Sequence, residues 1–367
     1  MNDFVSAHAT GATADDVVRR LADQLRTASG HTLGFLYVTS PLAERFGDVV
    51  AALRRDTGIE TWIGTVGHGV CASGVEHWGA PAAAVLSCRL AADSFHVIPS
   101  IEGVGSVRAA VTGAPPAGFG VVHGDPRNAA AVDIVAALSQ ERGAYLVGGL
   151  SSANSAFPQA CGARIVDGGV SGLLLGGRLR IAVGLTQGCA PIGPVHEVTG
   201  GEGQILVTLD GQRAFDVLCE DVGIAEGADP RPWLANVHAA LPVAGSDDAD
   251  YVVRNLVGID PRQGLVAIAD DLTRGDKVMF VRRDRASAEK DLRRMLTGLE
   301  ARLAERPKAG LYYSCVARGP NLFAREHHEM QAIRETFGDI PICGFFGNGE
   351  VSNDRVYGYT GVLALFA

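Results

Sequence analysis

Three segments of the chain repeat one pattern of apolar positions. Each begins with a short apolar run typical of a buried strand, continues with apolar residues at helical spacing, and has a second short run. The first runs are Leu33–Val38, Phe119–Val122 and Gly310–Cys315. The helical stretches end at Gly58, Gly143 and Gly338, as expected for a residue that readily terminates helices. The pattern predicts a strand–helix–strand unit that occurs three times.

The second run of each unit leads to a glycine and then to a turn-rich stretch. These glycines are Gly64, Gly148 and Gly344, and we expect them at equivalent strand-to-turn junctions. A hairpin should follow; in the second unit its turn is expected at Asp167-Gly168-Gly169. Strand–helix–strand crossovers are parallel and hairpins are antiparallel. The expected fold is therefore α/β with an α+β tendency: mixed β-sheets from repeated strand–helix–strand–hairpin units, helices on the outer faces, and two pseudo-related lobes.

Composition narrows the class of protein. The 367 residues are 47% hydrophobic and 20% charged, which supports a folded core rather than global disorder. The formal net charge of −9 disfavours nucleic acid and anionic membrane surfaces as partners. We find no apolar run long enough to span a bilayer and no pattern of a secretory leader. The seven cysteines lack CxxC spacing, so we expect a reduced, cytoplasmic protein without membrane insertion.

Four motifs carry a resemblance to a known family. They are Gly188-Cys189-Ala190-Pro191-Ile192-Gly193-Pro194, Leu209-Asp210-Gly211-Gln212-Arg213-Ala214-Phe215, Ser314-Cys315-Val316-Ala317-Arg318-Gly319 and Gly344-Phe345-Phe346-Gly347-Asn348-Gly349-Glu350. From about residue 30 onward the chain resembles the paired FIST domains, an intracellular sensory family. The resemblance implies a FIST N-like domain over 30–222 and a FIST C-like domain over 223–367. Residues 1–29 precede them and should form an N-terminal helix capped by Thr13.

The resemblance also implies a function. It suggests a cytoplasmic sensory protein of signal transduction that binds small ligands such as amino acids. The chain carries no kinase or cyclase sequence of its own, so a separate signalling protein, such as a kinase or cyclase, should receive the signal. We expect no enzymatic activity and no metal, because no catalytic or metal-binding motif is recognisable.

Arg318 is the sharpest candidate for contact with a ligand. It follows a strand end beside Ser314 and Cys315, and a guanidinium can hold a carboxylate through two parallel hydrogen bonds. Glu350, in a separate glycine turn, could take an ammonium group. The alternative is a structural Arg–Glu pair across adjacent loops, although we expect a loop arginine to contribute little to the core.

The glycine turns supply the remaining candidates, because glycine lets backbone N–H groups approach a ligand closely. A tight structural corner is the alternative interpretation. The complete candidate set for ligand binding is Arg318, Ser314, Cys315, Gly347, Asn348, Glu350, Gly148, Gly149, Ser151 and His68.

Two other functions stay open. Some members of the family bind haem as nitric oxide sensors, and His68 and His123 are the candidate axial ligands here. A cysteine-dependent hydrolase or transferase using Cys315 is the less favoured alternative, since no partner histidine is recognisable near it. We otherwise expect no cofactor.

Overall fold

The computed structural model describes residues 4–176, 179–225, 228–243 and 250–367. The chain forms two compact units: unit 1 comprises 1–186 and 292–367, and unit 2 comprises 187–291. The α-helices are α1 (Ala14–Gln24), α2 (Phe46–Thr57), α3 (Val107–Ala110), α4 (Ala131–Arg142), α5 (Ala214–Val222), α6 (Arg231–Leu234), α7 (Arg285–Arg302), α8 (Pro320–Phe323) and α9 (His328–Phe337).

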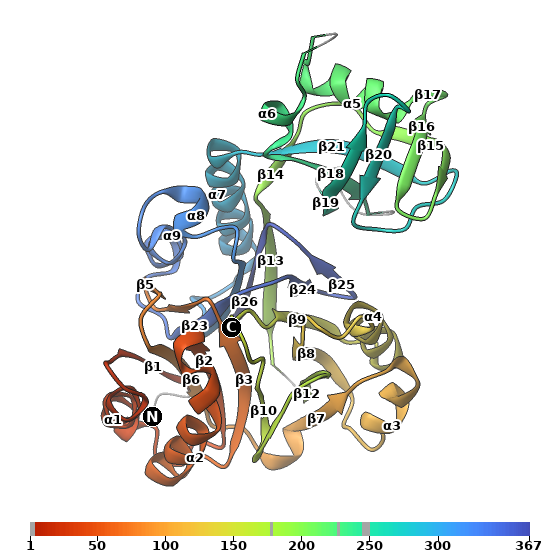
Figure 1. The fold of residues 1–367 in the computed structure, drawn as a ribbon. Helices are drawn as coiled ribbons and strands as arrows, with labels where there is room; N and C mark the ends of the chain where they lie inside the picture. Colours follow the sequence, from red (N-terminus) through yellow and green to blue (C-terminus); the bar gives the residue numbers. More distant parts are fainter. Residues whose placement is uncertain (1–3, 177–178, 226–227, 244–249) are drawn as a thin grey trace. The chain divides into compact units, whose positions relative to one another are not determined.

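Unit 1 contains three six-stranded mixed sheets (Figure 1). In strand order, the first sheet is β1 (Phe4–Thr10), β6 (Ala82–Cys88), β2 (Leu33–Thr39), β3 (Thr61–Gly67), β10 (Gln159–Gly162) and β11 (Arg164–Val166). The second is β25 (Arg355–Tyr357), β24 (Glu350–Ser352), β9 (Tyr145–Leu150), β8 (Ala117–Gly124), β12 (Val170–Gly176) and β7 (Phe95–Ile101). The third is β13 (Ile181–Gln187), β26 (Thr360–Phe366), β22 (Ala309–Cys315), β23 (Ile342–Gly347), β4 (Gly69–Ala72) and β5 (Val75–Trp78).

The predicted threefold repeat is confirmed in its parallel pairs. The first strand of each repeat pairs in parallel with the strand after its helix: β2 with β3, β8 with β9, and β22 with β23. The three glycines occupy one register position, opposite Leu36, Val122 and Tyr312 respectively. A Cβ added to any of them would lie 1.6–1.8 Å from the carbonyl oxygen of that opposite residue. Close approach of two backbones therefore requires glycine at this position.

The structure corrects three details of the expected fold. Gly64, Gly148 and Gly344 lie within β3, β9 and β23 rather than at strand-to-turn junctions, and the turns come later. The segment Asp167-Gly168-Gly169 connects β11 to β12, which lie in different sheets, so it is not a hairpin turn. A strand, β1, precedes the N-terminal helix α1, which Thr13 caps as expected by accepting the backbone N–H of Asp16.

Each repeat gives its hairpin to the sheet of another repeat. The hairpin β4–β5 of the first repeat pairs with β23 of the third. In the same way β10–β11 of the second repeat pairs with β3 of the first, and β24–β25 of the third pairs with β9 of the second. The exchange closes a cycle, so no repeat completes a sheet from its own strands.

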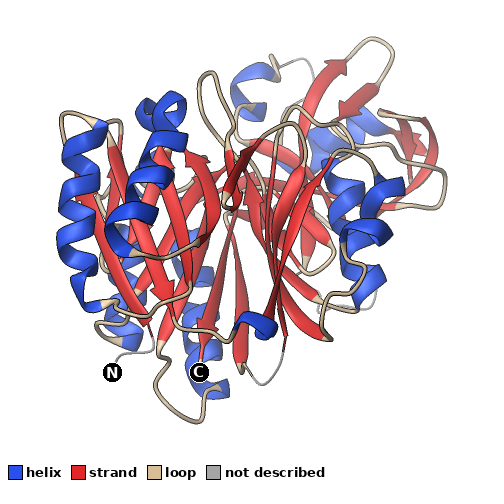
Figure 2. Cartoon of the chain, turned by 90° about the horizontal axis from the view of Figure 1, so that it is seen from below, coloured by secondary structure: helices blue, strands red, loops and turns tan. Residues whose placement is uncertain are grey.

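The core of unit 1 has an inner and an outer part. The inner faces of all three sheets contribute to one buried apolar cluster, with Phe35, Val121 and Leu311 as members from the three first strands. Helices cover the outer faces: α1 and α2 pack on the first sheet, α4 on the second, and α7 and α9 on the third. Figure 2 shows helices flanking the strands around the N-terminus. The three repeats thus lie together in unit 1. The internal similarity therefore relates three parts of this unit and not two lobes.

Unit 2 carries a different sheet, antiparallel in every pairing that the structure describes. Its strand order is β14 (Cys189–Pro191), β21 (Lys277–Arg283), β15 (His196–Glu202), β16 (Ile205–Leu209), β20 (Leu265–Ile268), β19 (Tyr251–Asp260) and β18 (Val237–Pro242), with β17 (Gln212–Arg213) paired to β16. His196 links three elements, because its Nδ1 lies 2.7 Å from Asp210 and its Nε2 lies 3.0 Å from Asp221 on α5. His196, which closely follows the motif around Gly193, thus contacts Asp210 of the next motif.

Candidate functional site

Arg318 is completely buried where β22 ends, and its guanidinium contacts a glutamate that sequence analysis did not identify. Its Nε donates to Oε1 of Glu329 at 2.9 Å, and its Nη2 lies 2.8 Å from the same oxygen. Both side chains have an exposed fraction of 0%. The expected Arg–Glu contact therefore exists, but with Glu329 of α9 rather than with Glu350. The expectation that Arg318 contributes little to the core is wrong, since it is among the largest fully buried side chains.

Glu329 is held by a shell of donors from its own repeat. The Tyr312 hydroxyl donates to Oε1 at 2.6 Å, and the Ser314 hydroxyl donates to Oε2 at 3.0 Å. The backbone N–H of Gly319 donates to Oε2 at 3.2 Å. The predicted candidates Arg318 and Ser314 therefore meet at one carboxylate.

A second buried glutamate comes from the first repeat. Oε1 of Glu76, on β5, accepts the backbone N–H groups of Glu329 and Met330 at 3.1 and 3.3 Å. It thus caps the N-terminus of α9 from another repeat. Burial, together with the charge of Glu329, raises the pKa of Glu76 to about 8.

Glu350 opens β24 and is also completely buried. Its Oε2 accepts the hydroxyl and the backbone N–H of Thr360 at 2.8 and 3.2 Å. Burial raises the pKa of Glu350 to about 8, although the bonds from Thr360 and the charge of Arg318 act in the opposite direction. Arg318 and Glu350 are therefore near enough to interact electrostatically, as the sequence led us to expect.

The other two repeats build the same positions from apolar residues. Tyr312 occupies the position of Leu36 and Val122, since all three lie opposite the repeat glycine. Ser314 corresponds to Val38 and Gly124 by the same register. Glu329 stands at the same distance from its helix-ending glycine as Val49 and Ile134 do, and both of these are fully buried. The third repeat has thus replaced an apolar helix–sheet contact with a polar cluster, defined here as Tyr312, Ser314, Arg318, Glu329 and Glu350.

The segment 316–327 covers the polar cluster. Phe323 of α8 lies over the Arg318 guanidinium at 5.4 Å and stacks on His328 at 4.5 Å. Ala324 and His327 in this segment have positive φ angles of 49° and 59°, which non-glycine residues rarely adopt. Tyr359, whose carbonyl oxygen lies 3.5 Å from Nη1 of Arg318, has a φ of 64°. Strained backbone of this kind gathers at functional sites more often than elsewhere.

The remaining candidates lie in three places. Gly149 pairs directly with Glu350, Gly148 pairs with Val351, and Gly347 pairs with Cys315 at the end of β22, so these glycines adjoin the cluster. Asn348, in the turn between β23 and β24, is exposed and donates its backbone N–H to the Leu150 carbonyl.

Ser151 and His68 lie at the turns of other repeats. Ser151 is buried, with its hydroxyl 2.6 Å from that of Thr65. His68 is half-buried in the turn between β3 and β4, and its backbone N–H donates to Ser152 at 2.9 Å. The structure shows no contact of either residue with the polar cluster.

Cys315 does not have the surroundings of a nucleophilic thiol. It is buried, and burial together with the charge of Glu350 raises its pKa far above the usual range. A reactive cysteine needs the opposite shift, toward the thiolate.

His123 occupies a packed position on the inner face of unit 1. Tyr37, His123 and Tyr313 follow the three residues opposite the repeat glycines, so they are equivalent in the repeat. They meet in the core: the Tyr37 hydroxyl lies 3.0 Å from Nε2 of His123 and 2.9 Å from the Tyr313 hydroxyl. Phe345 also packs against the imidazole, with 5.9 Å between ring centroids. Burial lowers the pKa of His123 to about 3. Rings fill the space around this histidine, and the site does not fit a haem.

Glu329 is the functional candidate that sequence analysis missed. A signal was available, since Glu329, Ile333 and Phe337 are spaced by four residues and therefore lie on one helix face. A carboxylate within a buried apolar stripe needs a partner in the core, and the nearby Arg318 supplies it.

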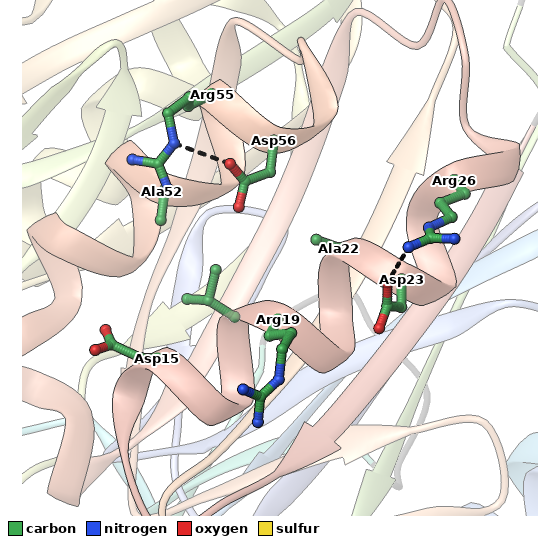
Figure 3. Close-up of a pocket in the computed structure, with 9 residues that line it drawn as sticks. Asp15, Arg19, Ala22, Asp23, Arg26, Ala52, Arg55 and Asp56 are labelled. Carbon is green, nitrogen blue, oxygen red and sulfur yellow. Dashed lines mark hydrogen bonds and ion pairs between the residues drawn. The ribbon is translucent and has the colours of Figure 1, made fainter.

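Two surface cavities lie away from these residues. One, of about 440 Å³, lies between α1 and α2 and is lined by surface ion pairs such as Arg26–Asp23 and Arg55–Asp56 (Figure 3). The other, also about 440 Å³, lies beside Ala367 and carries Arg180, Arg302 and Lys308. Both are open to solvent, and neither contains a predicted site residue. In the described residues, no helix combines the length and the apolar character needed to cross a bilayer.

Comparisons with known proteins show the family to which the chain belongs. The FIST N domain model matches residues 32–212, and the FIST C domain model matches residues 214–353. The chain belongs to the FIST family, which confirms the resemblance seen in its motifs. It is 29% identical over 383 residues to Uncharacterized protein MT0656 of Mycobacterium tuberculosis, covering 97% of this chain and 98% of the relative.

Two further relatives share shorter stretches. Uncharacterized protein Mb0898c of Mycobacterium bovis is 33% identical over 217 residues, or 55% of this chain and 54% of the relative. F-box only protein 22 of Homo sapiens is 35% identical over 74 residues, or 20% of this chain and 18% of the relative.

Proposed function

We propose that this protein is a cytoplasmic sensory protein that binds a small ligand at the polar cluster of its third repeat. FIST domains form a signalling-associated family, which gives the general role. The observation that carries the proposal is the replacement of Leu36, Val38 and Val49 by Tyr312, Ser314 and Glu329 in the third repeat.

The energetics support a role other than stability. A buried ion pair gains little over apolar side chains of similar volume, because both charges lose their hydration. The first two repeats show that this fold packs well with apolar residues at the same positions. The polar cluster is therefore dispensable for the architecture, and ligand recognition explains its presence.

The chemistry of Arg318 indicates the ligand class. A guanidinium binds a carboxylate through two parallel hydrogen bonds, and Glu329 already shows that the site accommodates such a group. A ligand carboxylate, as in an amino acid, can exchange with Glu329 at this position. Because the cluster is buried, entry requires movement of the strained segment 316–327.

The proposal includes no catalytic step. The surroundings of Cys315 oppose a cysteine-dependent reaction, so we propose a non-enzymatic protein without a cofactor. Its output passes to a separate signalling protein, such as a kinase or cyclase.

Native mass spectrometry and titration calorimetry test the proposal directly. We expect the purified protein to bind free amino acids, and we expect Arg318→Lys to weaken binding at least tenfold because the planar fork is lost. The matched control is Arg108→Lys, which alters an exposed Arg–Glu pair with Glu141 on the surface of the second repeat. Equal affinities for the wild type and Arg318→Lys contradict the site, and a Soret band in the absorption spectrum favours a haem protein instead.

A further inference from the structure

Of the two carboxylates in the polar cluster, Glu350 leaves one oxygen without a hydrogen bond, whereas both oxygens of Glu329 accept hydrogen bonds. The Glu350 side chain is completely buried, and its Oε2 receives both hydrogen bonds from Thr360. Oε1 is also buried and has no hydrogen-bond partner in the structure. Buried polar atoms are nearly always paired, so an unpaired carboxylate oxygen requires an explanation.

The repeat shows that this polar atom is not required by the fold. Glu350 pairs with Gly149, next to the pair made by Gly148, and its equivalents occupy the same register in the other hairpins. These equivalents are Val70 and Gln159. Val70 is apolar, and Gln159 uses both ends of its amide, donating to Gly169 and accepting from Ser171. Of the three, Glu350 alone leaves a polar atom unpaired.

Two charged side chains act on Glu350, the cation Arg318 and, more weakly, the anion Glu329. Among the residues that the structure describes, Arg318 is the one buried lysine or arginine, and it is already in contact with Glu329. Glu76 and Glu350 are buried beside this pair without a cation of their own, and the charge of Glu329 acts on both. Buried carboxylates favour a positive partner, so a further cationic group beside Glu350 would be stabilised electrostatically.

We propose that Oε1 of Glu350 binds a primary ammonium group of the ligand, while Arg318 binds its carboxylate. This inference rests on the proposed function and specifies the ligand as a small zwitterion or amine. In the binding step, the Glu350 carboxylic acid loses its proton to the solvent, and the ammonium group keeps its three protons and donates one N–H to Oε1. Binding therefore releases a proton.

Titration calorimetry near pH 7 in phosphate and in Tris tests this step, because the two buffers differ in ionisation enthalpy. Three sets of probes are compared: free amino acids, the corresponding primary amines, and the corresponding acids without the amino group. We expect probes with an ammonium group to release up to one proton and the deaminated acids to bind at least tenfold more weakly. Glu350→Gln, which preserves shape, should abolish proton release and weaken the amino acids at least tenfold, whereas Glu141→Gln serves as the surface control.

The outcomes separate the two proposals. If the deaminated acids bind as tightly as the amino acids and no proton is released, the ammonium site is wrong and the binding function stands. Unchanged proton release in Glu350→Gln also overturns the assignment. If none of the three probe sets binds to the wild type, the proposed function fails and the ammonium site fails with it. The proton count on the wild type decides the matter even if the variant folds poorly.

Discussion

Arg318 and Glu329 have charges that the core tolerates only because each satisfies the other. Removing one partner leaves a charge without hydration or a counterion, which costs far more than the pair contributes. The shell of Tyr312, Ser314 and Gly319 is arranged around the carboxylate and loses its acceptor as well. The residues of the cluster therefore act as one group in any stability measurement.

We expect Arg318→Ala to lower the free energy of unfolding by about 3–5 kcal/mol. A variant that copies the first repeat, with Tyr312→Leu, Ser314→Val and Glu329→Val together with Arg318→Met, should unfold much closer to the wild type. Urea denaturation of both variants measures the difference. If the apolar variant is as unstable as Arg318→Ala, the polar cluster is a structural requirement and the argument from the repeat is wrong.

Glu350 predicts a pH dependence of stability. Because its pKa is raised to about 8 in the folded protein, the folded state binds a proton that the unfolded state has already lost above about pH 4.5. Stability should therefore fall as the pH rises from 5 to 8, by about 1 kcal/mol per pH unit for such a group, and level off above 8. Glu350→Gln should reduce this slope in thermal melts across the range, and Glu76, whose pKa is also raised to about 8, should maintain the remainder. Parallel curves for the variant and the wild type would show that Glu350 titrates normally.

At the level of elements, the repeat glycines set how closely the parallel strands approach. Gly148, with a φ of 136°, would place a Cβ 1.8 Å from the Val122 carbonyl oxygen, whereas Gly118 in the neighbouring β8 has open space. The atoms that the added Cβ would meet belong to the backbone of Val122, so no flexible side chain can move away to make room.

We expect Gly148→Ala to destabilise the protein by about 3 kcal/mol or more, and Gly118→Ala to change stability by about 1 kcal/mol or less. Chemical denaturation of the two variants gives the comparison. Equal effects would mean that the strands can separate at little cost. The interpretation of the glycine register that the three repeats share would then be wrong.

The sequence predicted those features that local patterns specify. Apolar periodicity and glycine stops located β2, β8 and β22 and the three helices that follow them. It did not predict the exchange of hairpins, because the pairing of β24 with β9 joins residues far apart and leaves no local pattern. For the site, Arg318 and Ser314 were identified from a strand end, and Glu350 was identified from a glycine turn. Glu329 was missed because its contact with Arg318 forms across the helix–sheet interface, and local sequence patterns do not show such tertiary contacts.

For the molecule as a whole, unit 1 is discontinuous in sequence, since residues 187–291 form unit 2 between its second and third repeats. The first repeat contacts the polar cluster of the third, because Glu76 caps α9, the helix that carries Glu329. A signal that displaces α9 or the segment 316–327 therefore reaches the first repeat through β5 and the second through β24. If the proposed ligand binds in the third repeat, these direct contacts connect its site to the other two repeats.

The cyclic hairpin exchange also determines the order in which the protein can mature during its synthesis. The hairpin β4–β5 belongs to the first repeat, yet its partner β23 is made only with the third. The second sheet likewise waits for β24, so the nascent chain carries incomplete sheet edges until the third repeat is made. Exposed edges invite pairing with other chains, and a prematurely terminated product keeps them. Translation of the third repeat therefore completes the second sheet as well as its own, and until then β9 and the hairpin β4–β5 lack their partners.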